Sequence, residues 1–202
     1  MNTIFLASGS PRRAELLRQM GLPFRVLPQD IDETFLSRRP RREALRLAAG
    51  KVEALTAALA ASEAPPDRFW ALGADTFVVR GGHLTGIRRL LGKPADRDEA
   101  RRMLRRLSGR VQTVITGLAL RAPSGHLTLR SCETRVLFAR LSDREIEWYL
   151  DSGEWEGAAG AYRIQGKGGC LVRSIKGSYT NVMGLPIQLL YGILQEHQYP
   201  FG

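Results

Sequence analysis

The feature that most constrains this chain is its opening, where a short apolar run meets the start of a helix. Residues Thr3–Ala7 (TIFLA) are typical of a buried strand. Ser10 then stands where an N-cap residue would, with Pro11 at the first helical position, and this predicts a helix to about Met20 that Gly21 ends. Such a helix start favours an anion, because its free N–H groups and the positive end of the helix dipole point at the preceding loop.

Two arginines, Arg12 and Arg13, occupy the first turn of this helix. They oppose the helix dipole, which costs about 0.3 kcal/mol each unless an anion is bound. Arginine forks match phosphate geometry, and Ser8 and Ser10 supply hydroxyl groups beside them. An ordinary capped helix with exposed arginines fits the local pattern equally well, so both interpretations stay open at this point.

The remaining elements follow from hydrophobic periodicity. Strands are expected over residues 24–27, 69–79, 111–120 and 134–140, and helices over 43–61, 96–107, 142–151 and 185–196. Loops are expected over 64–67 and over most of 153–169. Strands and helices that mix without strict alternation indicate the α/β class with a mixed sheet. A chain of 202 residues holds one sizeable core or two small lobes sharing a cleft.

Several classes of protein do not fit this composition. No apolar run of about 18 residues occurs, so no membrane span is expected. The N-terminus has no signal-peptide pattern, which favours the cytoplasm. The two cysteines lie outside any C-x-x-C motif, and the three histidines lack zinc-ligand spacing. Any metal would therefore be held mainly by carboxylates, which suits Mg²⁺ or Mn²⁺.

The net charge of +10 is weak evidence for an anionic partner, since it comes from a strong arginine bias that base composition can produce. Only four of the 30 basic residues are lysines, and a lysine kept in such a chain indicates a need for a compact point charge. This reasoning singles out Lys51 and Lys93.

Four arginines cluster on the expected helix 96–107. They are Arg101, Arg102, Arg105 and Arg106. A solvated helix face explains them better than nucleic-acid binding does. Aromatic residues are only 7% of the chain and none interleaves with a basic stripe, as single-strand binding requires.

Three acidic residues indicate a candidate site for a divalent ion and a reacting water. Asp75 interrupts an apolar strand, where a carboxylate is costly to bury unless it binds something; capping a nearby backbone group is the simpler alternative. Asp32 and Glu33 form a second acidic pair in a loop. Together these carboxylates could hold a divalent ion and position a water, while Lys51 and Lys93 neutralise phosphate charge.

Over residues 3–194 the chain resembles the Maf family of nucleoside triphosphate pyrophosphatases. The motifs that carry the resemblance, in order, are LASGSPRRAELLRQMG, DIDET, GADT, LGKP, LSG followed by TVITGLAL, AGAYRIQG and IKGSYTNVMGLP. The resemblance implies one Maf-like domain over 1–202, with a Maf/inosine-triphosphatase-like α/β fold, a mixed twisted sheet and two lobes around a central cleft. It also implies hydrolysis between the α and β phosphates with a divalent cation, Mg²⁺ or Mn²⁺.

The resemblance also implies roles for individual residues. Asp75 resembles the general base and, with Glu33, a metal or water ligand. The phosphate-binding set is Ser8, Arg12, Arg13, Lys51 and Lys93. Thr76 and Gln165, with Arg12, resemble positions that set base preference, and an amide suits a pyrimidine edge because it both donates and accepts.

SGSPRR, ADT and IQG are similar to the branch of the family that acts on dTTP and UTP, which implies thymidine and uridine nucleotides, modified ones included, as substrates and nucleotide-pool sanitation as the purpose. The alternative is a non-catalytic regulatory protein, since family members are linked to inhibition of septum formation. Members often form homodimers, and the sequence leaves the oligomeric state open.

The chain departs from the family pattern in two places. The segment between Thr76 and Lys93 is longer than the family's usual short turn, which puts the position of Lys93 in question. Gln112 stands where the family commonly has histidine.

Overall fold

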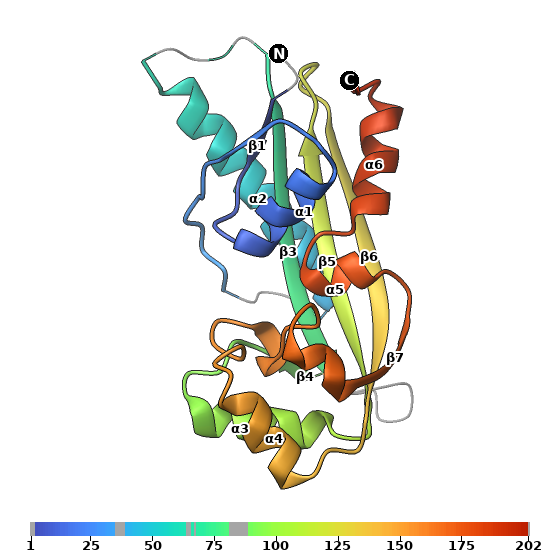
Figure 1. Ribbon diagram of the computed structural model, residues 1–202. Coiled ribbons are helices and arrows are strands. Elements are labelled where there is room, and N and C mark those ends of the chain that lie inside the picture. Colours follow the sequence, from blue (N-terminus) through green and yellow to red (C-terminus); the bar gives the residue numbers. More distant parts are fainter. Residues whose placement is uncertain (1–2, 35–38, 64–65, 67, 81–88, 202) are drawn as a thin grey trace. The chain divides into compact units, whose positions relative to one another are not determined.

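A mixed seven-stranded sheet flanked by helices forms the protein (Figure 1). The computed structural model describes residues 3–34, 39–63, 66, 68–80 and 89–201. The strands run in the order β2-β1-β3-β5-β6-β7, and β4 pairs with β3. Their bounds are β1 Ile4–Leu6, β2 Phe24–Val26, β3 Trp70–Arg80, β4 Arg89–Leu91, β5 Val111–Arg121, β6 Leu127–Phe138 and β7 Val172–Lys176. The expected α/β class with a mixed sheet is confirmed.

The helices are α1 Pro11–Gln19, α2 Pro40–Ala60, α3 Arg97–Leu107, α4 Asp143–Leu150, α5 Tyr179–Met183 and α6 Ile187–Glu196, with 3₁₀ turns η1 Ala159–Ala161 and η2 Lys167–Leu171. Within the described ranges, no helix combines the length and hydropathy needed to cross a membrane.

The chain divides into two compact units. The first comprises the described residues of Met1–Asp75, Thr116–Cys132 and Gly184–Gly202, and the second those of Thr76–Ile115 and Glu133–Met183. β3, β5 and β6 each contribute residues to both units. The two units are described separately below.

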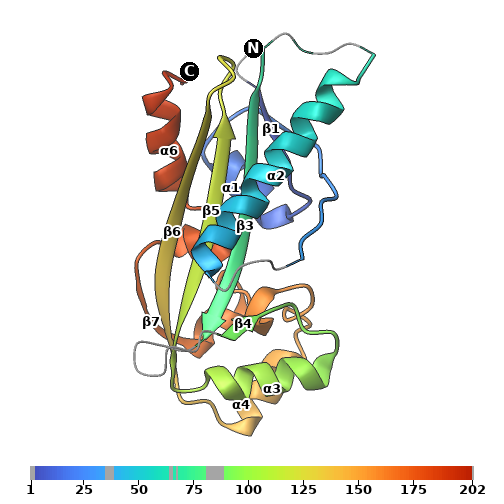
Figure 2. The same cartoon turned by 180° about the vertical axis from the view of Figure 1, so that it is seen from behind.

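In the first unit, parallel strands carry a helix on each face. β1 pairs in parallel with both β2 and β3, with Ile4 opposite Phe24 and Trp70. α1 follows β1 on one face of the sheet, and α2 covers the other face (Figures 1 and 2).

Helix α2 lies directly on the sheet because two glycines leave room for its backbone. A Cβ atom on Gly73 would lie 2.4 Å from the carbonyl oxygen of Ala48, and one on Gly117 would lie 2.2 Å from that of Ala44. Both distances are far below van der Waals contact, so the helix could not sit at this depth over larger residues. Val52, Leu55 and Leu59 continue the buried face of α2.

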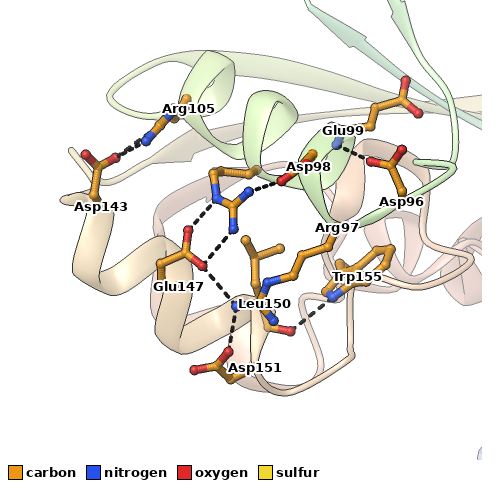
Figure 3. Close-up of polar contacts among 11 residues, drawn as sticks. Asp96, Arg97, Asp98, Glu99, Arg105, Asp143, Glu147, Leu150, Asp151 and Trp155 are labelled. Carbon is orange, nitrogen blue, oxygen red and sulfur yellow. Dashed lines mark hydrogen bonds and ion pairs between the residues drawn. The ribbon is translucent and has the colours of Figure 1, made fainter.

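The second unit has its own core, into which α3 and α4 turn their apolar faces. α3 contributes Ala100, Met103, Leu104 and Leu107, and α4 contributes Ile146, Tyr149 and Leu150. Outside this core, Arg97 and Arg101 both bind Glu147, and Arg105 binds Asp143 (Figure 3). Two of the four clustered arginines, Arg101 and Arg105, therefore form ion pairs on the solvated face of α3, as expected.

The start of one helix and the capping contact of another differ from the predictions. α2 begins at Pro40 rather than at residue 43, and Ala44, Leu47 and Ala48 are buried in its first half. Ser10 is the N-cap of α1 by backbone conformation, but its side chain makes no capping hydrogen bond. The oxygen of Ser8 accepts from the Ser10 N–H instead.

The strand pattern was harder to predict. β6 begins at Leu127 rather than at residue 134, because its first half is rich in polar residues and only Thr128 is buried there, which leaves no regular hydrophobic alternation. β4 and α5 are too short to show a period, and the segment carrying η2 and β7 is rich in glycine. The loop expected over 64–67, apart from residue 66, lies outside the described residues, and so does half of the long segment between Thr76 and Lys93, namely 81–88.

Candidate active site

One lysine joins two carboxylates in the first unit. The Nζ atom of Lys51 lies 2.7 Å from Oδ1 of Asp75 and 2.7 Å from Oε1 of Glu33. The side chains of Lys51 and Asp75 are 10% and 11% exposed, while that of Glu33 is 58% exposed. The contact between Lys51 and Asp75 is therefore nearly buried, whereas Glu33, the second carboxylate that Lys51 binds, is open to solvent.

The close docking of α2 explains why these groups meet. Ala48 contacts the sheet at Gly73, and Lys51 follows Ala48 by about one helical turn, on the same side of α2. Asp75 follows Gly73 by two residues, on the same face of β3. The contact between Gly73 and Ala48 therefore places the ammonium over the carboxylate.

The segment carrying Glu33 is held by Asp32 and by two residues that the sequence did not single out, Glu43 and Arg46. Nη2 of Arg46 donates to the carbonyl oxygen of Thr34 at 2.8 Å and to the buried Glu43 at 2.6 Å. The Thr34 N–H donates to Asp32 at 2.8 Å, and hydrogen bonding from Thr34 lowers the pKa of Asp32. Asp32 thus shapes its own turn. The spacing of Glu43 and Arg46 along the expected helix was the available signal for this anchor.

The loop between β1 and α1 forms a second cluster in the same unit. Arg13 is buried; its Nη1 donates to Oγ of Ser8 at 2.8 Å, and its Nε donates to the carbonyl oxygen of Gly184 at 2.9 Å. Ser8 is also buried, whereas Arg12 is half-buried. The two neighbouring arginines therefore differ: Arg13 organises the loop from inside, and Arg12 is the more accessible cation.

Electrostatics connects the two clusters of the first unit. Burial lowers the pKa of Arg13, the negative charge of Asp75 raises it, Arg12 lowers it and Glu33 raises it. The carboxylates that Lys51 holds thus also act on the buried guanidinium, which places anionic and cationic groups in one electrostatic region.

The other predicted residues belong to the second unit. Thr76 follows Asp75 in β3 and is half-buried. Lys93 is exposed between β4 and α3, and Gln165 is exposed between η1 and η2. The hydrogen bonds and ion pairs described above join Ser8 to Arg13, and Lys51 to Glu33 and Asp75; they do not include these three.

Gln112, the departure from the family pattern, is a core residue of the second unit. It is 1% exposed in β5, and no hydrogen bond of normal geometry to the described residues reaches either polar atom of its amide. Burial raises the pKa of the Tyr162 hydroxyl, and the nearby Gln112 amide partly opposes this effect. Gln112 therefore faces the buried Tyr162 inside this unit.

Residues able to hold a metal are few. Among the described residues, no group of three or more His, Cys, Asp or Glu side chains gathers at one point. Asp75 and Glu33, drawn together by Lys51, nevertheless fit Mg²⁺ or Mn²⁺, because such ions commonly bind one or two protein carboxylates together with substrate phosphates and water.

Comparison with known proteins shows which sequences and folds the chain resembles. A family model described as Maf-like protein matches residues 3–197. A dTTP/UTP pyrophosphatase of Agrobacterium fabrum is 48% identical over 186 residues, covering 91% of this chain and 86% of the relative. A dTTP/UTP pyrophosphatase of Brucella abortus is 47% identical over 199 residues, covering 98% and 92%. Among solved structures, a HAM1 protein from Coxiella burnetii has a similar fold, with a TM-score of 0.52, 17% identity and coverage of 97% and 100%.

Proposed function

The chain belongs to the Maf family, and from this premise we propose that it is a hydrolase that cleaves dTTP and UTP to the monophosphate and pyrophosphate. The observation that carries the proposal is the contact of Lys51 with both Asp75 and Glu33. The names of the relatives from Agrobacterium fabrum and Brucella abortus support the choice of nucleotides. Removal of unwanted pyrimidine nucleotides from the pool is the biological purpose we propose.

Asp75 is the general base in this proposal. Its carboxylate accepts a proton from the attacking water as the α–β phosphoanhydride bond breaks, and the bonding electron pair leaves with pyrophosphate. Lys51 holds one oxygen of this carboxylate at 2.7 Å, which fixes the base before substrate arrives. The same ammonium offers positive charge where phosphate charge develops.

The β1–α1 loop binds phosphate through unequal partners. Oγ of Ser8 accepts hydrogen bonds from Arg13 and from the Ser10 N–H, so the Ser8 hydroxyl keeps its own hydrogen to donate to a phosphate oxygen. Arg12 contributes the more accessible guanidinium. Arg13 supports both by holding the loop in place.

A divalent cation, Mg²⁺ or Mn²⁺, completes the proposal, with Glu33 and Asp75 as its protein ligands. When bound, such an ion neutralises charge on the transferred phosphate groups. The ligand roles are tested by the metal dependence of the reaction in Glu33→Gln.

Thr76, Lys93 and Gln165 keep the roles that the family resemblance implies. We propose that Lys93 neutralises phosphate charge and that Thr76 and Gln165 contribute to base preference. Each role is tested by its own substitution, since Lys93→Met should raise KM for all nucleotides whereas Gln165→Ala should change their ranking.

The deciding experiment is a panel of nucleoside triphosphates incubated with the protein and Mg²⁺ or Mn²⁺. Pyrophosphate, rather than orthophosphate, is expected from dTTP and UTP. Asp75→Asn should lower kcat at least about 100-fold, because a general base contributes roughly 10² to 10⁴ in rate. Asp143→Asn, on the exposed face of α4, is the matched control and should retain activity.

If no nucleotide yields pyrophosphate, the enzyme proposal fails and the regulatory binding protein becomes the better candidate. Action in the cytoplasm and a homodimeric state are separate proposals. Cell fractionation tests the first, and light scattering of the purified protein tests the second.

A further inference from the structure

The loop that carries Gln165 is fixed at its backbone on both sides of that residue. Before it, the Arg163 N–H donates to the Tyr149 hydroxyl at 3.1 Å. After it, two successive backbone N–H groups donate to one side chain, that of Glu154. Gln165 itself is exposed. The orientation of its amide therefore depends on a loop whose position is set by its neighbours.

Glu154 makes the most extensive of these contacts. Its Oε1 accepts from the Lys167 N–H at 3.0 Å, and its Oε2 accepts from the Gly168 N–H at 3.3 Å. Its own N–H donates to Oγ of Ser152 at 3.2 Å. Both carboxylate oxygens are thus engaged with the turn that follows Gln165, and hydrogen bonds to a charged acceptor are stronger than those between neutral groups.

Gly166 shows how closely the carboxylate approaches this loop. A Cβ atom at residue 166 would lie 2.4 Å from Oε2 and 2.6 Å from Cδ of Glu154. Because any side chain there would displace the carboxylate, the glycine between Gln165 and Lys167 permits the contact. The motif IQGKG therefore contains both the proposed base reader and the site that receives Glu154.

We propose that Glu154 is a positioning residue for nucleotide selection: it fixes the turn after Gln165 and thereby orients the amide that reads the base. This inference rests on the proposed function, in which Gln165 contributes to base preference. An exposed side chain discriminates between similar bases only if its backbone is held, because a mobile amide can satisfy either pattern of donors and acceptors.

The first test compares UTP with CTP, which differ in the donors and acceptors of the pyrimidine edge. In Glu154→Gln, an amide NH₂ replaces one carboxylate oxygen and opposes a backbone N–H. We expect the ratio of kcat/KM for UTP to that for CTP to fall roughly tenfold, mainly through KM. Glu156→Gln neutralises an exposed carboxylate two residues away and should leave the ratio unchanged.

The second test asks whether Glu154 acts through Gln165. Gln165→Ala should lower the same ratio by itself, and adding Glu154→Gln to it should produce no further change. Equal, additive effects in both backgrounds would assign Glu154 to general stability and overturn the inference.

The third test reads the loop without any nucleotide. The chain has four lysines, of which Lys51 is buried, Lys93 precedes a proline, and Lys167 and Lys176 are exposed. A lysine-specific protease should cut after Lys167 faster in Glu154→Gln than in the wild type or Glu156→Gln, with the cut after Lys176 as internal reference. Gly166→Ala should give the same result, and it replaces Glu154→Gln if that variant does not fold.

The outcomes separate the inference from the proposed function. Unchanged cleavage after Lys167 in both loop variants overturns the inference even if the enzyme is active. Faster cleavage with an unchanged UTP/CTP ratio also overturns it, provided that Gln165→Ala alters that ratio. If the wild type releases no pyrophosphate from any nucleotide, the proposed function fails, and the selection role of Glu154 fails with it.

Discussion

The two units hold their main ion pairs in different surroundings. In the first unit, Lys51 meets Asp75 in a nearly buried position. In the second, Arg97 and Arg101 bind Glu147 on the outside of α3 and α4, where the Glu147 side chain is 40% exposed (Figure 3). The helices also dock differently, since α2 lies with its backbone on glycines of the sheet while α3 and α4 meet through apolar side chains.

This difference indicates which ion pairs serve the reaction rather than the stability of the fold. A buried ion pair gains little net stability, because desolvation offsets its attraction, and the loss of one partner leaves an uncompensated charge. An exposed pair is screened by water and salt and contributes little in either direction. The buried ion pair of the first unit therefore calls for a functional explanation. The exposed network only links the surfaces of α3 and α4.

The largest expected effect comes from breaking the buried pair. Lys51→Met should destabilise the fold by about 3 to 5 kcal/mol, because Asp75 is left unpaired where water hardly reaches it. Pyrophosphate release should be lost as well. Denaturant unfolding and the nucleotide assay measure the two effects.

Lys176→Met, at an exposed lysine of β7, is the control and should change neither stability nor activity. Adding Asp75→Asn to Lys51→Met should restore part of the stability but none of the activity. Equal stability of all these variants would contradict the distinction between buried and exposed pairs.

A smaller loss of stability is expected when the docking of α2 on the sheet is disturbed. In Gly73→Ala the new Cβ would lie 2.4 Å from the Ala48 carbonyl oxygen, so the helix must shift, at a cost of about 1–3 kcal/mol. Because the same contact sets Lys51 over Asp75, activity should fall too. Thermal unfolding and kcat report the two changes.

Gly192→Ala, in α6, should change the stability in the opposite direction. A Cβ at that position meets nothing within 4 Å, and alanine favours a helix by about 0.5–1 kcal/mol over glycine. This variant should therefore be slightly more stable and fully active. A stabilised Gly73→Ala would show that α2 does not rest on the sheet as described.

The smallest effect is expected in the exposed network of the second unit. Hydrogen bonds from Arg101 and then Arg97 lower the pKa of Glu147 to about 2, from 4.5. Since this pKa is depressed in the folded state, the contribution of Glu147 is present above pH 4.5 and is lost as pH falls towards 2.

Glu147→Gln should accordingly flatten the acid loss of stability between those two pH values, with little effect near neutrality and none on kcat. Urea midpoints measured across this range give the comparison. A large loss of stability at neutral pH would mean that the network supports the fold more than its exposure indicates.

Much of the local structure could be predicted. The strand–loop–helix opening and the two helices expected over 96–107 and 142–151 are present close to where periodicity put them. The failures have local causes too, since the first half of β6 has only one buried residue and no regular alternation, and α5 is too short to show a period. These signals lie within a few neighbouring residues, which is why the sequence alone carries them.

The sequence by itself thus determined which residue types could serve a phosphate site, including Lys51, Asp75 and Glu33, and the family to which the chain belongs. Only the tertiary structure decided how those residues meet. In the folded chain Arg13 is buried in the loop between β1 and α1, and Arg46 holds the segment that carries Glu33. Lys51 reaches Asp75 because the backbone of α2 contacts the sheet at Gly73. Such contacts join residues far apart in the chain, and their distances depend on packing that no local pattern records.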